Sequence, residues 1–429
     1  MKDIFKIFTQ KSFIQKMSFF LFSALASSAI GFLTLPLYTR LLDPNAIGII
    51  ETFNASTTFF SSIILLGAGT LVLKDYWSIG KEKLMNLIGN IIVVQIVVSI
   101  VLVVSLCLIY IVSPTIISKG GLTFELTLLA LFVSLTIAIH TLYLTLLQIE
   151  GVAVIYFLIV VGRVVLEHIV SFILIIFIAP NFMYRFIGAV FSSLVFSVIV
   201  FMRLKKEGLV LNLERTNTLY IFRLGIPLVF SEIAGWGLQV IDRFMINGMK
   251  TVADTGIYSV GYKFGMLVMI FDQAFGRTWI SYFMKNISKN ETNINKDIVR
   301  RIYIYFSIFL IVLIVYSLFV KELMGLLLDK RYISAGYIAI IVAYSYFFDG
   351  IWRTGNAFLV YHGMTKTYSV VVTIAAILNV ALNYLYIGKY GIAGAAWATF
   401  FSMVFGALVT MIIVVKVHKM PWVRFRHGK

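Results

Sequence analysis

The feature that most constrains this chain is a series of apolar runs, each long enough to cross a membrane. One of them reads "LIGNIIVVQIVVSIVLVVSLCLIYIV", from Leu87 to Val112. A helix of about 20 apolar residues spans the hydrocarbon core of a bilayer. Only 13% of the residues are charged, against roughly 25% in a soluble domain. The sequence therefore predicts an all-α polytopic membrane protein and argues against a water-soluble enzyme.

Charged residues, Gly and Pro separate the runs and predict twelve transmembrane helices joined by short loops. The first run resembles a signal peptide because lysines precede it, but it continues to about Tyr38. The apolar core of a signal peptide is shorter, about 7–15 residues, so we expect an uncleaved first helix. The expected spans are 17–39, 47–73, 87–113, 123–148, 153–179, 184–203, 219–246, 253–283, 302–328, 334–360, 367–387 and 391–415.

Most of the 36 Lys and Arg residues lie in segments that twelve spans place on one side of the membrane. Cytoplasmic loops collect Lys and Arg, so we expect both termini in the cytoplasm. The formal net charge of +17 then reflects these loops, and no nucleic-acid partner is expected. The basic tail, 417–429, contains a Trp and a Phe and is expected to contact membrane lipids at the cytoplasmic surface.

Two segments indicate an internal repeat. "LPLYTRLLDPNAIGIIETFNA" begins at Leu35, and "LQVIDRFMINGMKTVADTGIYSVGYK" begins at Leu238. In both, we expect a helix to end around an Arg and a Gly-Ile pair to open the next helix, with a longer turn in the second. Parallel repeats of this kind form two six-helix bundles around a central cavity. The predicted domains are an N-terminal bundle (1–203), a basic cytoplasmic linker (204–218), a C-terminal bundle (219–416) and the tail.

Ionisable side chains inside the spans are the candidate functional residues. Each costs at least about 2.5–3.5 kcal/mol in the bilayer core, so it usually faces a partner or a cavity. Two pairs, Arg163 with Glu167 and Asp349 with Arg353, have i,i+4 spacing. Such pairs can neutralise themselves on one helix face or line a path, and the sequence leaves both open.

The span 253–283 carries Lys263, Asp272 and Arg277. Lys263 has no acidic residue three or four positions away. In a continuous helix Lys263 and Arg277 would lie about 21 Å apart along the axis, which favours the wall of a water-filled cavity.

Three charged residues lie near the ends of spans. Asp242 and Arg243 close the span 219–246, and Arg40 occupies the matching position in the first half. Neighbouring side chains on a helix point about 100° apart, so we expect Asp242 and Arg243 to have separate partners. We interpret all three as outer-gate or turn elements. By similar reasoning Glu51 is expected at the interface, and His140 in a helix–helix contact.

Familiar enzyme and metal motifs are missing from the sequence. It contains no phosphate-binding loop of the ATPase type, no HExxH and no paired cysteines, since Cys107 is its single Cys. We therefore predict no catalytic residues, no cofactor and no metal site.

The stretch "GIPLVFSEIAGWGLQVIDRFMINGMKTVADTGIYSVGYKFG", from Gly225 to Gly265, closely resembles the seventh and eighth helices of Wzx-type polysaccharide (O-antigen) flippases. These belong to the multidrug/oligosaccharidyl-lipid/polysaccharide exporter superfamily, with the multidrug and toxin extruders and the lipid II flippases. The matching elements are Pro227, the Asp242–Arg243 pair and "GIYSVGYK". "FLTLPLYTRLLDPNAIGI" is similar to the first helix of the family. The resemblance covers essentially the whole chain, although the last four spans match mainly in hydropathy.

The resemblance implies a MATE-like fold and a location in the bacterial inner membrane. It implies transport of an undecaprenyl-pyrophosphate-linked oligosaccharide to the periplasmic leaflet by alternating access, for O-antigen or capsule synthesis. An ion gradient of H⁺ or Na⁺ would drive transport, and the polysaccharide polymerase machinery is a further candidate partner.

Placement inside the spans, and not the family, selects the site residues. Arg163, Lys263, Arg277 and Arg353 are candidates for binding the pyrophosphate or an acidic sugar, since cationic side chains bind phosphate through charge-assisted hydrogen bonds. Glu167, Asp272 and Asp349 are candidates for ion coupling. The main alternative is a multidrug–cation antiporter of the same superfamily, in which acids should outnumber cations. A membrane-embedded glycosyltransferase would need larger loops than this chain has, and a structural scaffold would need fewer intramembrane charges.

Overall fold

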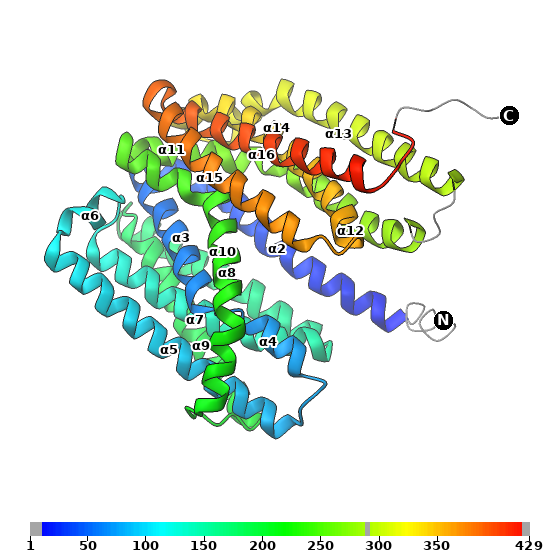
Figure 1. The fold of residues 1–429 in the computed structure, drawn as a ribbon. Helices are drawn as coiled ribbons and strands as arrows, with labels where there is room; N and C mark the ends of the chain where they lie inside the picture. Colours follow the sequence, from blue (N-terminus) through cyan, green and yellow to red (C-terminus); the bar gives the residue numbers. More distant parts are fainter. Residues whose placement is uncertain (1–10, 288–291, 423–429) are drawn as a thin grey trace. The chain divides into compact units, whose positions relative to one another are not determined.

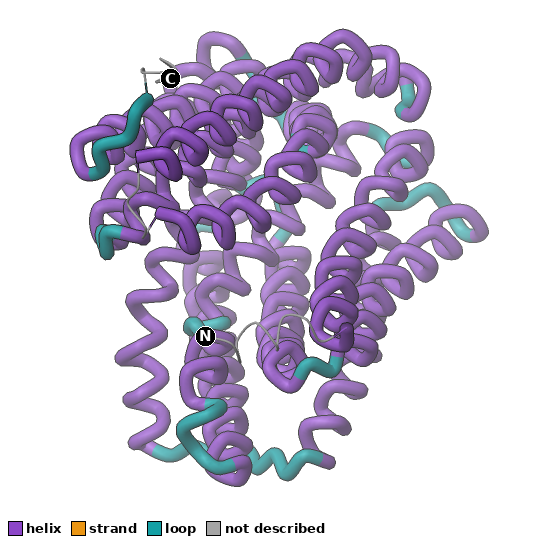
Figure 2. Tube along the Cα trace, turned by 90° about the vertical axis from the view of Figure 1, so that its right-hand side faces the viewer, coloured by secondary structure: helices purple, strands orange, loops and turns teal. Residues whose placement is uncertain are grey.

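The computed structural model describes residues 11–287 and 292–422, and these residues form helices and loops without any strand (Figures 1 and 2). The expected all-α architecture is therefore confirmed. The helices are α2 (Lys11–Leu41), α3 (Pro44–Ile64), α4 (Ala68–Asp75), α5 (Lys81–Val112), α6 (Pro114–Lys119), α7 (Phe124–Glu150), α8 (Ala153–Phe177), α9 (Met183–Lys206), α10 (Arg215–Met249), α11 (Val252–Gly265), α12 (Leu267–Ile287), α13 (Thr292–Leu327), η1 (Lys330–Ala335), α14 (Gly336–Tyr361), α15 (Thr365–Tyr390) and α16 (Ile392–Val417).

Each of the twelve expected spans corresponds to one of these helices or to consecutive helices. Among the described residues, ten helices are long and apolar enough to cross a membrane. The count is eleven if α3 and α4, which are bent by 42°, form one span. The expected span 253–283 corresponds to α11 and α12, and neither is among these ten helices. Helix α11 has only 14 residues, which is too short to cross a membrane alone. The chain is thus a multi-pass membrane protein.

The break between α3 and α4 has a local cause. Leu66 has φ 47° and Gly67 has φ 63°, which is the left-handed region. A non-glycine residue there costs roughly 1–2 kcal/mol, so Leu66 carries backbone strain. A Cβ atom at Gly67 would also collide with the side chain of Leu228 from α10. Glycine at position 67 therefore permits both the bend and the close approach of α10.

The turn before α11 differs from the sequence expectation. Arg40 does lie in the last turn of its helix, as expected. In the second half, however, α10 continues beyond Arg243 to Met249. The additional residues between Arg243 and Gly256 therefore extend a helix and do not lengthen a turn. The new helix starts at a capping box, in which Thr251 and Asp254 each satisfy the other's backbone N–H group.

The chain divides into two compact units within α10, the first being Met1–Trp236 and the second Gly237–Lys429. The first half of α10 stays with the first unit because it is bonded to it. Tyr220 donates to Asp75 at 2.8 Å, and the Trp236 indole donates to the Ala55 carbonyl at 3.0 Å. The predicted bundle boundary at the linker 204–218 lies before this division and stays a prediction.

In the second unit α14 is the central helix. It packs against α11, α12, α13 and α16, and α15 packs mainly against α16. The indole of Trp352 on α14 lies where a Cβ atom at Gly406 would be. Small residues on α16 therefore let α14 approach closely, which holds in place the charged side chains that α14 carries.

Replacing Gly67 by Ala tests the strained bend. We expect the free energy of unfolding of Gly67→Ala to fall by at least about 1–2 kcal/mol, because an L side chain is strained at φ 63° and meets Leu228. Thermal unfolding followed by circular dichroism measures the change. Gly31→Ala in α2 is the control, since nothing lies within 4 Å of its added Cβ atom. Equal melting temperatures for the two variants would contradict the strain argument.

Candidate functional site

Three charged residues of the first unit form what we call the first-unit cluster: Arg163, Glu167 and Arg185. The Glu167 carboxylate on α8 forms an ion pair with Arg185 on α9 through one of its oxygens. The Arg163 guanidinium lies 3.5 Å from the other oxygen of Glu167. The side chains of Glu167 and Arg185 are each only 11% exposed, whereas that of Arg163 is 25% exposed. The i,i+4 pair expected from the sequence is therefore completed by a second cation from the next helix.

Aromatic and polar side chains surround this cluster. The Arg185 guanidinium lies 5.8 Å from the centre of the Tyr38 ring on α2. The Tyr38 hydroxyl is 3.0 Å from Nδ1 of His168, which follows Glu167 on α8. Glu51 on α3 acts on Arg185 as a second negative charge and is buried inside the protein, while its expected position at the membrane interface stays a prediction. Helices α2, α3, α8 and α9 thus all contribute to one polar site.

Sequence reasoning missed Arg185. It is the second residue of the expected span 184–203, a position normally assigned to the membrane interface. In the structure α9 begins at Met183 and the Arg185 side chain turns into the protein. One indication of a second cation was available in the sequence. Glu167 on the preceding helix has two carboxylate oxygens, and its i,i+4 partner Arg163 needs only one of them.

The second-unit cluster consists of Asp272, Asp349 and Arg353. Nη2 of Arg353 lies 2.8 Å from Asp272 on α12 and 2.5 Å from Asp349 on its own helix, α14. The Tyr305 hydroxyl donates to the other oxygen of Asp272 at 2.8 Å. A Cβ atom at position 350 would lie 2.6 Å from Asp272, so Gly350 allows that carboxylate to reach α14. The structure thus brings together three of the predicted site residues.

Arg353 is placed for an additional partner. Its side chain is 41% exposed, while those of Asp272 and Asp349 are 7% and 21% exposed. Both carboxylates contact the same nitrogen, and among the described residues Nε and Nη1 make no hydrogen bond. Because a guanidinium has five N–H donors, most of its capacity remains for another anion.

The other two cation candidates lie on either side of a helix break. Lys263 is half-buried on α11, and Arg277 lies on α12, where its side chain is outside the described part of the structure. The two helices are separated at Met266. The expected axial separation of about 21 Å assumed one continuous helix, whereas the structure interrupts the helix at Met266, so that separation stays a prediction.

Asp242 and Arg243 contact each other, and each also has the separate partner that we expected. Nη1 of Arg243 lies 2.9 Å from Asp242 Oδ1, and the backbone N–H of Arg243 donates to the same atom at 2.8 Å. The Tyr258 hydroxyl donates to the other Asp242 oxygen, and the Arg243 guanidinium lies 4.7 Å from the centre of the Tyr262 ring. Both charged residues are buried, so the pair joins α10 to α11. Arg40, in contrast, is exposed at the end of α2.

Other polar residues of the spans make hydrogen bonds between helices or within one helix. His140 on α7 lies 3.0 Å from Ser197 on α9, as expected for a helix–helix contact. Asn383 donates to the side-chain oxygen of Asn379 one turn earlier at 3.0 Å. Within residues 11–287 and 292–422, no group of three or more His, Cys, Asp or Glu side chains is arranged to hold a metal ion.

Comparison with protein families gives two matches. The family described as "Polysaccharide biosynthesis protein" matches residues 13–286, which is more than half of the chain. The family described as "MatE" matches residues 227–385. A curated relative, the "Probable low-salt glycan biosynthesis flippase Agl15" of Haloferax volcanii, is 25% identical over 191 residues. That match covers 43% of this chain and 40% of the relative.

Solved structures share the fold. One is the inward closed conformation of the lipid II flippase MurJ, with a TM-score of 0.70 and 17% identity, covering 94% of this chain and 87% of that one. Another is an inward-facing multidrug resistance MATE family transporter of the MOP superfamily, with a TM-score of 0.68 and 15% identity. It covers 95% of this chain and 99% of that one. The expected MATE-like fold is therefore confirmed.

Removing one cation from Glu167 should cost more stability when the cation is Arg185 than when it is Arg163. Arg185→Met leaves Glu167 with one partner at 3.5 Å, and breaking a buried ion pair costs about 3–5 kcal/mol. Arg163→Met retains the more buried ion pair and serves as the matched control. The two melting temperatures in detergent measure the difference, and a larger loss for Arg163→Met would overturn the assignment of Arg185 as the main partner.

Proposed function

The chain belongs to the polysaccharide biosynthesis protein family, and from this premise we propose that it is a flippase for undecaprenyl-pyrophosphate-linked oligosaccharides. It moves these repeat units from the cytoplasmic to the periplasmic leaflet of a bacterial inner membrane, for O-antigen or capsule synthesis. Both termini lie in the cytoplasm, and the polymerase machinery receives the translocated units. The protein transports and does not catalyse a covalent reaction.

The single observation that carries this proposal is the partly exposed Arg353 in the second-unit cluster. Its guanidinium lies on a predicted membrane span and retains unused N–H donors. A pyrophosphate offers several anionic oxygens, and arginine binds such groups through paired charge-assisted hydrogen bonds. Arg163, also partly exposed, provides the equivalent group in the first unit, and Lys263 and Arg277 complete the cationic set.

The acidic residues of the clusters supply a route for ion coupling. Asp272 and Asp349 both compete with substrate for Arg353. When either carboxylate takes up H⁺ or binds Na⁺, its attraction for Arg353 weakens and the guanidinium becomes available to phosphate. Glu167 has the same relation to Arg163. Substrate binding and ion binding are therefore thermodynamically linked through the arginines.

Alternating access provides the transport step. Transporters built from two helical bundles move one bundle against the other around a central site. The two compact units are the moving parts, and the Asp242–Arg243 pair with Arg40 forms the outer-gate or turn elements. This motion opens the central site to the opposite leaflet. No large loop is needed to carry the substrate across the membrane.

A multidrug–cation antiporter is the second candidate. It is favoured by the "MatE" family match at residues 227–385 and by the charge of the second-unit cluster, in which two acids face one cation. An organic cation would bind to the carboxylates and not to Arg353. The two candidates therefore predict opposite responses to removal of the positive charge at residue 353.

A genetic experiment tests the flippase proposal. Deletion of the gene in a strain that makes a surface polysaccharide should abolish the polymer, while lipid-linked repeat units accumulate on the cytoplasmic side. Accumulated units are measured by extraction and by their inaccessibility to an impermeant probe in intact spheroplasts. Normal amounts of surface polymer in the deletion strain, with no redundant exporter present, would contradict the proposal.

Site variants test the cationic set. Lys263→Ala, Arg277→Ala and Arg353→Ala should each reduce polymer export at least tenfold, because phosphate loses a charged donor worth more than about 1.4 kcal/mol. Arg331→Ala is the matched control, since Arg331 pairs with Asp329 in an exposed position outside the cluster. Quantitative immunoblots of membranes confirm equal amounts of protein. Drug resistance that rises in Arg353→Ala while export stays unchanged would favour the antiporter.

A further inference from the structure

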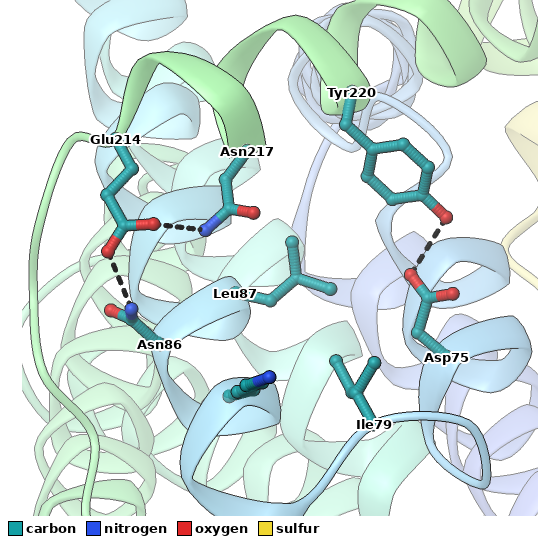
Figure 3. Close-up of a pocket in the computed structure, with 8 residues that line it drawn as sticks. Asp75, Ile79, Asn86, Leu87, Glu214, Asn217 and Tyr220 are labelled. Atoms are coloured by element: carbon teal, nitrogen blue, oxygen red, sulfur yellow. Dashed lines mark hydrogen bonds between the residues drawn. The ribbon is translucent and has the colours of Figure 1, made fainter.

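A polar pocket of about 510 Å³ lies in the first unit, apart from both charged clusters (Figure 3). This volume is within the range of about 300–1,000 Å³ typical of small-molecule sites. Three segments form it: the end of α4 with the following loop, the first turns of α5, and the start of α10. The lining residues are Asp75, Ile79, Lys83, Asn86, Leu87, Glu214, Asn217 and Tyr220.

Hydrogen bonds fix the polar groups of the pocket in place. Glu214 accepts from Asn86 at 2.6 Å and from Asn217 at 2.9 Å, and Asn212 donates to it at 2.8 Å. Asp75 accepts from the Tyr220 hydroxyl at 2.8 Å. Figure 3 shows these two polar groups on opposite sides of the apolar side chains of Leu87 and Ile79. The pocket is thus preorganised, with two separated polar sites and an apolar strip between them.

This arrangement does not suit a small ion. Each carboxylate already accepts hydrogen bonds from neutral donors, and Lys83 adds a positive charge to the lining. The volume is also far larger than a metal ion needs. A polyanion such as a free pyrophosphate is disfavoured by the charges of Asp75 and Glu214. A neutral ligand therefore fits the electrostatics better than either kind of ion.

A sugar fits both the polar and the apolar parts of the lining. A hydroxyl group donates one hydrogen bond and accepts others, so it can match carboxylates, amides and an ammonium group at once. The C–H face of a pyranose ring can lie against Leu87, Ile79 or the ring of Tyr220. We propose that this pocket binds a neutral, hydroxyl-rich glycosyl group.

The position of the pocket suggests where such a group comes from. The loop after α4 and the linker before α10 belong to the segments predicted to be cytoplasmic. Trp77, between the lining residues Asp75 and Ile79, is 79% exposed, and an exposed Trp at the end of a span is typical of the headgroup level of a bilayer. A glycosyl group at that level belongs to a lipid of the cytoplasmic leaflet. This link to transport depends on the proposed function, whereas sugar binding itself does not.

Saccharide binding to the full-length protein tests the inference. The protein is placed in phosphatidylcholine nanodiscs, which contain no sugar-headed detergent. Saturation-transfer difference NMR then measures binding of glucose, galactose and N-acetylglucosamine, with sorbitol as an acyclic control. We expect at least one sugar to give a signal that falls threefold or more in Ile79→Trp, which fills the pocket and keeps its polar groups. Leu73→Trp, at a 57% exposed position on α4 outside the lining, should bind like the unmodified protein.

Other outcomes of these experiments decide between the alternatives. No signal from any of the three sugars, or an undiminished signal in Ile79→Trp, would overturn the inference. A stronger pocket-dependent signal from octyl glucoside than from glucose identifies a lipid-borne glycosyl group, and equal signals identify a free one. Failure of the deletion phenotype with intact pocket-dependent binding would contradict the flippase proposal and leave this inference standing. Normal export by Ile79→Trp, in which sugar binding is lost, would contradict the link between the pocket and transport and leave sugar binding by the pocket standing.

Discussion

The hydrocarbon core of the bilayer offers no hydrogen-bond partners, and this constraint governs the structure. Backbone groups satisfy this constraint by forming helices, which loops connect throughout the described residues. Ionised side chains meet it by pairing inside the protein. The buried Glu167, Asp242 and Asp272 each accept hydrogen bonds or ion pairs from at least one arginine or tyrosine. The position of each polar cluster therefore follows from which helices can bring a cation and an acid together.

The two main clusters solve this problem in different ways. In the first unit two arginines share one acid, and in the second unit two acids share one arginine. The first leaves Arg163 as its more exposed cation, and the second places its arginine against two carboxylates. Both arrangements depend on contacts between different helices.

Much of the fold could be predicted from the sequence because a long apolar run indicates a segment that lies in the hydrocarbon core of the bilayer. The twelve spans and the charged residues within them were found in this way. Side-chain partners were harder. Angular position on a helix suggested that Asp242 and Arg243 diverge, yet the long arginine side chain folds back to its neighbour. Arg185 was missed because hydropathy shows where a span ends but not which way a terminal side chain turns.

The helix break at Met266 and the pocket beside Glu214 illustrate the same limit. Nothing in the local composition of "GYKFGMLVMI" distinguishes a continuous helix from two helices, and in the structure both α11 and α12 pack against α14. The linker was recognised only as basic. Its Asn212 and Glu214 acquire a role through contact with Asn86, more than a hundred positions earlier in the chain.

The Glu167–Arg185 ion pair also bears on how the protein is made. The partners lie on α8 and α9, consecutive helices joined by a short loop, so they can meet as soon as both have left the ribosome. A helical hairpin with its charges neutralised partitions into lipid more readily than either helix alone. Arg353 on α14 pairs with Asp272 on α12, and α13 lies between these two helices in the sequence. The hairpin of α8 and α9 can therefore be neutralised as soon as it is made, whereas Asp272 in the second unit must wait for a cation that is synthesised two helices later.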